Sequence, residues 1–126
     1  MKFEDFSPID DIGVAKATAH QNGKIGFSTG ANKLLDFEKN RSFKVSKNAD
    51  DPEDPNLYLV PTTEEDEKAF KVNKAGNYYY LRLKHILDKL DINYRENRVI
   101  FDIRAEKKDN VQYFKLMMRP IKKRKK

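Results

Sequence analysis

Short runs of alternating apolar and polar residues predict strands over most of this chain. Two such runs flank Asn22-Gly23, and a similar pair flanks Ala75-Gly76. Each place is therefore predicted to be a β-hairpin. Asn-Gly is typical of a type I′ turn, in which both central residues need positive φ, and Ala-Gly is a weaker form of the same signal.

After each hairpin the apolar spacing changes to that of a helix. In the second half of the chain, apolar residues fall at i, i+3, i+4 and i+7, at Leu83, Ile86, Leu87 and Leu90. The first half has the shorter series Ala31, Leu34 and Leu35, with Ser28 or Thr29 available as N-cap. Alternating runs then return at 42–45 and 57–61, and at 98–103 and 114–120, which predicts two further strands after each helix.

Both halves thus have the same predicted order of strand, turn, strand, short helix, strand, loop and strand. We expect an α+β fold of mostly antiparallel strands with two short helices, in which internally duplicated β-β-α-β-β units form one pseudo-symmetric barrel-like domain. The first unit covers residues 14–61 and the second 69–120, joined by a linker at 62–68. Residues 1–13 are expected to be a flexible N-terminus, and 121–126 a disordered basic tail.

Two segments of the chain carry a family resemblance. They run from His20-Gln-Asn-Gly-Lys-Ile-Gly-Phe27 to Leu34-Leu-Asp-Phe37, and from Asn73-Lys-Ala-Gly-Asn-Tyr-Tyr-Tyr-Leu81 to Ile86-Leu-Asp-Lys-Leu90. In each, a glycine and a strand precede a short helix that ends in a leucine-rich turn. This pattern resembles the AbrB-like swapped-hairpin domain, the group of the AbrB, SpoVT, MazE and MraZ types.

The resemblance has implications for fold and function. It implies two interlocked copies in one barrel and a role in DNA binding and transcription regulation. Carried over by position, it implies that Lys24, Arg82 and Lys84 contact the DNA backbone, with Lys74 in the neighbourhood of the second hairpin.

The composition restricts the chemistry and the location of the protein. The 126 residues include no Cys and no Trp, and 37% of them are charged. The absence of Cys excludes disulfides and thiol chemistry. No apolar run approaches the roughly 18 residues that span a bilayer, and residues 1–10 lack a signal-peptide core. We expect an intracellular, cytoplasmic protein without a membrane partner.

The net charge of +6 is unevenly distributed along the sequence. Residues 50–67 carry eight acids and no base, whereas 68–126 carry eighteen bases and six acids. The chain ends in five consecutive bases, of which Lys122, Lys123 and Arg124 are predicted to dock on phosphates. The alternative interpretation is a tail that only increases solubility.

Residues suited to catalysis or metal binding are scarce in the sequence. The separation of His20 and His85 along the sequence does not match the spacing of metal ligands. No phosphate-binding loop or nucleophile motif is present. We therefore expect no enzyme, no cofactor and no metal site.

The run Tyr78-Tyr79-Tyr80 is the most unusual apolar feature. In a strand, Tyr78 and Tyr80 would face one side of the sheet and Tyr79 the other. Tyr79 is a possible base-stacking residue, with core packing as the alternative role.

Three functions remain open from the sequence. The favoured one is a small regulator that binds double-stranded DNA mainly through phosphate contacts. A structural or protein-interaction module without nucleic-acid binding is the first alternative, and the acidic segment favours it. A single-strand binder using the tyrosines is the second. The protein is a monomer or a homo-oligomer in each case.

Overall fold

The computed structural model describes residues 1–5 and 14–123. Part of the predicted N-terminus (6–13) and Arg124, with the rest of the tail, lie outside the described residues. The strands are β1 (Lys16–Ala19), β2 (Lys24–Phe27), β3 (Ser42–Ser46), β4 (Leu57–Pro61), β5 (Ala69–Lys71), β6 (Asn73–Ala75), β7 (Tyr78–Arg82), β8 (Asn97–Lys108), β9 (Val111–Met118) and β10 (Lys122–Lys123). The helices are α1 (Thr29–Leu35) and α2 (Lys84–Lys89).

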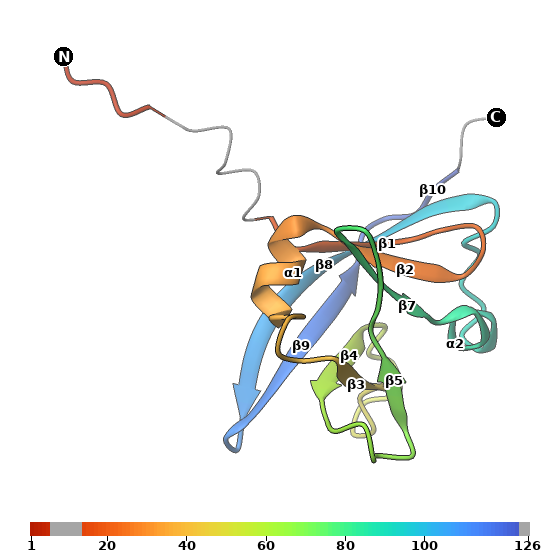
Figure 1. Ribbon diagram of the computed structural model, residues 1–126. Coiled ribbons are helices and arrows are strands. Elements are labelled where there is room, and N and C mark those ends of the chain that lie inside the picture. Colours follow the sequence, from red (N-terminus) through yellow and green to blue (C-terminus); the bar gives the residue numbers. More distant parts are fainter. Residues whose placement is uncertain (6–13, 124–126) are drawn as a thin grey trace.

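The strands form a nearly closed, barrel-like antiparallel sheet (Figure 1). Its order is β5-β3-β4-β9-β8-β1-β2-β7-β6, with β10 paired to β8. Only Val72 separates β5 from β6, so one continuous stretch of chain provides both ends of this order. The Val72 N–H donates to the carbonyl oxygen of Arg41 at 2.8 Å, where the chain changes partners. The predicted α+β class, the antiparallel strands, the barrel-like shape and the two helices are confirmed.

The strands of the two predicted units are interleaved. Within the unit 14–61, β1 pairs with β2 and β3 with β4, and within 69–120, β6 pairs with β7 and β8 with β9. Four more ladders, β1–β8, β2–β7, β3–β5 and β4–β9, join one range to the other. The sheet therefore closes only when both ranges are present.

The core is built from the inward positions of these strands and the turn after α1. Phe37, at 1% exposure, is its aromatic centre. The centroid of its ring lies 4.9 Å from that of Phe27, 5.7 Å from that of Phe43 and 5.2 Å from that of Tyr79. Such edge-to-face and tilted contacts are favourable beyond the burial of area alone.

Both helices end in the same hydrogen-bonded form. After α1, Asp36 N–H donates to Lys33 O and Phe37 N–H to Asn32 O. After α2, Asp91 N–H donates to Asp88 O and Ile92 N–H to Leu87 O. Asp36 (φ 53°) and Asp91 (φ 57°) occupy the left-handed position of this Schellman motif, where Gly is usual. At its start, α1 is capped by Ser28, whose Oγ accepts from the N–H of Ala31.

The first hairpin forms where it was predicted, but its turn differs. Gly23 has φ 86° and Asn22 has no positive φ, so the predicted type I′ turn is wrong. His20 N–H donates to Lys24 O, and Gly23 N–H donates to His20 O. The loop 21–23 is therefore of the three-residue kind, in which a turn is followed by a glycine that forms a β-bulge in the left-handed conformation. Such a loop needs only one residue with positive φ. Two consecutive positive φ values occur instead at Asp109-Asn110, between β8 and β9.

The described part of the expected tail, residues 121–123, contains a short strand. Lys122 pairs with Arg98, and Lys123 with Asn97, so these two residues form β10 instead of a disordered tail. Beyond the end of β9 at Met118, the chain continues in the same direction along β8. The backbone of β8 therefore offers its hydrogen-bonding groups to β10. The expectation of a disordered tail is thus wrong for the part that the structure describes.

Candidate nucleic-acid interface

Lys24 on β2 and Arg82 on β7 are directly opposite each other in the β2–β7 ladder. Their neighbours Ile25 and Leu81, which also form a pair, are fully buried. Because side chains alternate along a strand, Lys24 and Arg82 point out of the barrel. Two of the predicted DNA contacts, remote in sequence, therefore meet at one point on the surface.

The ring of Tyr80 contacts both of these cations. Lys24 Nζ is 4.6 Å from its centroid, and the guanidinium carbon of Arg82 is 5.7 Å from it. Arg82 Nη2 also donates to the Tyr80 hydroxyl at 3.4 Å. These contacts cover Tyr80, which is only 9% exposed, and hold both cations against the sheet.

Tyr78 extends the aromatic surface across β2. Its ring stacks on Tyr80 with centroids 6.1 Å apart, and its hydroxyl hydrogen-bonds His20 Nε2 at 2.5 Å. Gly26 leaves the space in which the Tyr78 side chain crosses β2, because a Cβ there would lie 1.3 Å from the Tyr78 hydroxyl. Burial raises the pKa of Tyr78, which keeps the hydroxyl protonated. At 38% exposure, Tyr78 is the accessible tyrosine of the run.

Further bases continue the Lys24–Arg82 pair across the sheet. Ala19 on β1 pairs with both Ile25 and Val99, so Arg98 lies one step beyond Val99 toward the same end of the barrel as Lys24. Lys122 is the direct partner of Arg98 on β10. We call Arg82, Lys24, Arg98 and Lys122 the basic strip. Sequence reasoning missed Arg98, because its place depends on the β1–β8 register.

Lys84 lies beside the basic strip, at the start of α2. A Cβ on Gly23 would fall 2.4 Å from Lys84 Cβ, and Leu83 N–H donates to Gly23 O at 3.1 Å. The start of α2 thus packs directly on the turn that precedes Lys24. Lys123 is also exposed, but it follows Lys122 in β10 and points to the other side of that strand.

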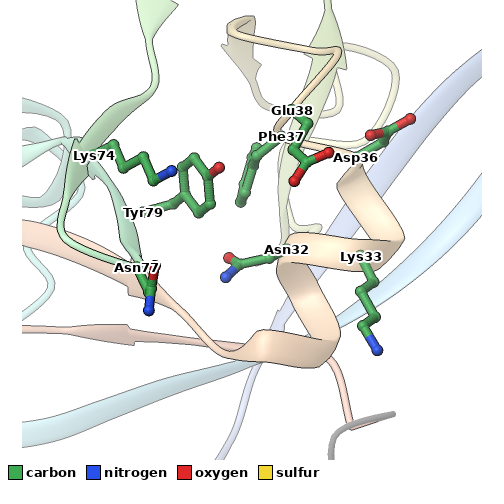
Figure 2. Close-up of a pocket in the computed structure, with 8 residues that line it drawn as sticks. All are labelled: Asn32, Lys33, Asp36, Phe37, Glu38, Lys74, Asn77 and Tyr79. Carbon is green, nitrogen blue, oxygen red and sulfur yellow. The ribbon is translucent and has the colours of Figure 1, made fainter.

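Lys74 and Tyr79 are not part of the basic strip. They line a pocket between the end of α1 and the β6–β7 hairpin (Figure 2). Tyr79 is 7% exposed and packs on Phe37, while Lys74 Nζ lies 5.4 Å and the Arg41 guanidinium carbon 5.7 Å from its ring centroid. Its ring faces the interior, which matches the alternative role in core packing and leaves little of the ring exposed for base stacking. The predicted alternation along the run is confirmed, since Tyr78 and Tyr80 share the outer face.

Several charges of the second half are neutralised within the chain. Arg95 pairs with Asp88 at 3.1 Å, and Arg119 with Asp102 at 2.7 Å. The hydrogen bond and charge of Arg119 lower the pKa of Asp102, which keeps this carboxylate ionised. Among residues 14–123, no carboxylate forms an ion pair with a member of the basic strip. The strip therefore offers its charge to a ligand.

The acidic residues at 50–67 lie in the β3–β4 and β4–β5 connections. Figure 1 draws these connections in the lower part of the molecule, whereas the β1–β2 hairpin and β10 lie at the upper right. The acidic segment thus does not cover the basic strip. Its best-defined side chain is Asp54, which accepts hydrogen bonds from the Tyr58 hydroxyl and from Asn48 Nδ2.

The described part of the chain has neither a cluster of metal ligands nor a helix that could span a membrane. Within 1–5 and 14–123, no group of three or more His, Asp or Glu side chains is arranged to hold a metal ion. Neither α1 nor α2 has the length and apolar character needed to cross a membrane.

The geometry of the site is thus a strip of four outward bases with two tyrosines beside it, on a sheet held by eight antiparallel ladders along its main order. Comparison with protein-family models, with curated proteins and with solved structures finds no match to this chain.

Proposed function

We propose that the protein binds double-stranded DNA through the basic strip. The observation that carries this proposal is the outward cross-strand pair of Lys24 and Arg82, which share the ring of Tyr80 and have no carboxylate partner among the described residues. Cations fixed on a rigid sheet suit phosphate contacts, which position a protein on DNA without reading its sequence. Lys84 adds a further charge next to this pair.

The proposed biological role is that of a cytoplasmic transcriptional regulator of the AbrB-like kind, with an internally duplicated unit. The strand pairings support the duplication. Exchanging β1 with β6, β2 with β7, β3 with β8 and β4 with β9 preserves the ladders of the main order, if β5 and β6 count as one strand. Three pairs of ladders change places, and β2–β7 and β4–β9 map onto themselves. The Schellman motif at the end of both helices and the positive φ of Gly23 and Gly76 in the two hairpins also support the duplication.

The test is fluorescence anisotropy with labelled duplex DNA over a salt series. The full chain is compared with the double variant Lys24→Ala, Arg82→Ala and with the matched control Lys107→Ala, Lys108→Ala, whose lysines are exposed at the far end of β8. Loss of two phosphate contacts is expected to reduce the slope of log K against log salt by about 2. The control should keep the slope of the parent protein.

The same assay includes a single-stranded probe, because the exposed ring of Tyr78 beside four bases favours single-strand binding as a second candidate. A single-strand preference that disappears in Tyr78→Ala would support that candidate. Equal binding of duplex DNA by all three proteins would contradict the basic strip as the contact surface. No binding of either probe would contradict both proposals and favour a protein-interaction module.

A further inference from the structure

A groove on the outer face of the sheet lies where β4 and β9 separate. The ladder between these strands ends at the pair Leu59–Phe114, although both strands continue. Since Leu59 and Phe114 are buried, the next residues, Val60 and Tyr113, point outward, and both line the groove. Its volume is about 280 Å³. Sites for drug-sized ligands begin at about 300 Å³, so this groove is suited to one large side chain.

Two tyrosines in the lining are held in place by their hydroxyl groups. The ring centroids of Tyr58 and Tyr113 are 5.8 Å apart. The Tyr58 hydroxyl donates to Asp54, and the Tyr113 hydroxyl donates to Glu106 at 2.8 Å. Both tyrosines are only half-buried, and Val111 beside them is 51% exposed. The groove therefore offers accessible apolar surface on a fixed frame.

The charged side chains that line this groove are all positive. Lys47 lines it after the end of β3, and Lys108, the ladder partner of Val111, lines it from the end of β8. No Asp or Glu of the described chain is part of the lining, and within 14–123 neither lysine forms an ion pair. The complementary ligand is an aromatic side chain that lies next to carboxylates.

The chain itself contains a segment of this chemistry. Residues 1–5, which we call the arm, read Met1-Lys-Phe-Glu-Asp5, so that two acids directly follow an aromatic residue. Phe3 is 82% exposed, and Figure 1 draws the arm well apart from β4 and β9. The ring of Phe3 is thus left largely uncovered by its own chain, and its burial elsewhere would be favourable.

We propose that the arm of a second copy of this chain docks in the groove, and that two copies exchange their arms in a symmetric dimer. Phe3 packs on the two tyrosine rings, and the two carboxylates that follow it pair with Lys47 and Lys108. The long lysine side chains can reach carboxylates on either side of an extended segment. Because the same contact is made in both directions, the assembly closes after two copies and covers both Phe3 rings.

The test is sedimentation equilibrium of the full chain in the absence of DNA. A dimer of twice 14.8 kDa is expected at about 0.1 to 1 mM protein, since contacts of such small area belong to the weak class of interfaces. Phe3→Ser should raise the dissociation constant about tenfold or more, because the burial of two rings is lost. The matched control Ile121→Ser changes another exposed apolar residue, outside the groove, and should dimerise like the parent protein.

A charge exchange tests the pairing directly. The arm variant Glu4→Lys, Asp5→Lys and the groove variant Lys47→Glu, Lys108→Glu each place like charges together, so each should be monomeric. An equimolar mixture of the two should form the dimer again, since every arm then meets a groove of opposite charge. Recovery in the mixture also shows that both variants are folded.

The matched control for the charges is Lys71→Glu, Lys89→Glu, which reverses two exposed lysines outside the groove and should dimerise like the parent. Three results would overturn the proposal: a parent chain that stays monomeric up to about 1 mM, a dimer that persists in Phe3→Ser or in both charge variants, or a mixture that stays monomeric.

The dimer and the DNA interface are tested separately. No residue of the arm or the groove belongs to the basic strip, so a monomeric parent chain would leave the proposed DNA binding untouched. The DNA titrations run far below the concentrations at which the dimer forms, so replacement of Lys108 in their control does not act through the dimer.

Discussion

The hydroxyl of Tyr78 lies directly over Gly26, at the position that a side chain there would occupy. Tyr78 reaches across β2 in this way to hydrogen-bond His20. The glycine therefore determines where the only accessible ring of the tyrosine run is held on the outer face.

Gly26→Ala should displace Tyr78 and break its hydrogen bond to His20. Since the displaced atoms are the far end of a side chain, the free energy of unfolding should fall by only about 1 kcal/mol. Loss of the nuclear Overhauser contact between the rings of His20 and Tyr78 would report the displacement, and urea unfolding would report the stability. Tyr78→Ala is the control for the missing ring, and a retained contact in Gly26→Ala would contradict the prediction.

The hydrogen bond between Tyr58 and Asp54 predicts a pH dependence with two limbs. It lowers the pKa of Asp54 from 3.8 to about 2, so this stabilisation is present above pH 3.8 and is lost as the pH falls toward 2. It raises the pKa of Tyr58 from 10.0 to about 12, so here the stabilisation is present below pH 10.0 and is lost as the pH rises toward 12. Tyr58→Phe should therefore be less stable than the parent only between these limits.

Urea unfolding of the parent and of Tyr58→Phe across this pH range measures the difference. The variant Asp54→Asn and the double variant complete a cycle that isolates the pair. A stability difference that is constant with pH would show that the lost hydroxyl acts through packing and not through this hydrogen bond.

The left-handed aspartates that end both helices predict stabilising substitutions. A residue with a Cβ is strained at positive φ, whereas Gly is not. Asp36→Gly and Asp91→Gly should each raise the free energy of unfolding by about 0.5 to 1 kcal/mol. Thermal unfolding of the two variants, with Asp109→Gly in the β8–β9 turn as a third positive-φ site, tests this. A lower stability of both helix variants would mean that the aspartate side chains contribute more than the strain costs.

The interleaved ladders predict that neither unit folds alone. A chain cut in the exposed connection at residues 64–65 leaves each fragment without the partners for four of its ladders. We expect residues 1–64 and 65–126 to be unfolded separately by circular dichroism and to recover the strand signal when mixed, with a midpoint that depends on concentration. A fragment that folds by itself would contradict this.

The sequence was informative where structure is set by near neighbours. The Gly-containing hairpins and the alternation along Tyr78–Tyr80 depend on residues a few positions apart, and they were predicted. The cap of the first helix was narrowed to Ser28 or Thr29, and Ser28 forms it. The turn at Asp109-Asn110 was missed because it contains no glycine, although Asp and Asn also tolerate positive φ.

Features that depend on remote pairing were not predictable in the same way. Tyr79 packs on Phe37, which comes from another part of the chain, so the sequence left both base stacking and core packing open for this residue. The place of Arg98 beside Lys122 likewise requires the register of β8 against β10. Local patterns contain no information on either contact.

The alternation of β7 gives one strand two different surroundings. Tyr79 belongs to the pocket, and its sequence neighbours Tyr78 and Tyr80 belong to the outer surface with the basic strip. Any ligand that shifts β7 from one side changes the geometry offered on the other. Linkage then requires reciprocity: if a ligand bound beside Tyr79 alters the affinity for DNA by some factor, DNA alters the affinity for that ligand by the same factor.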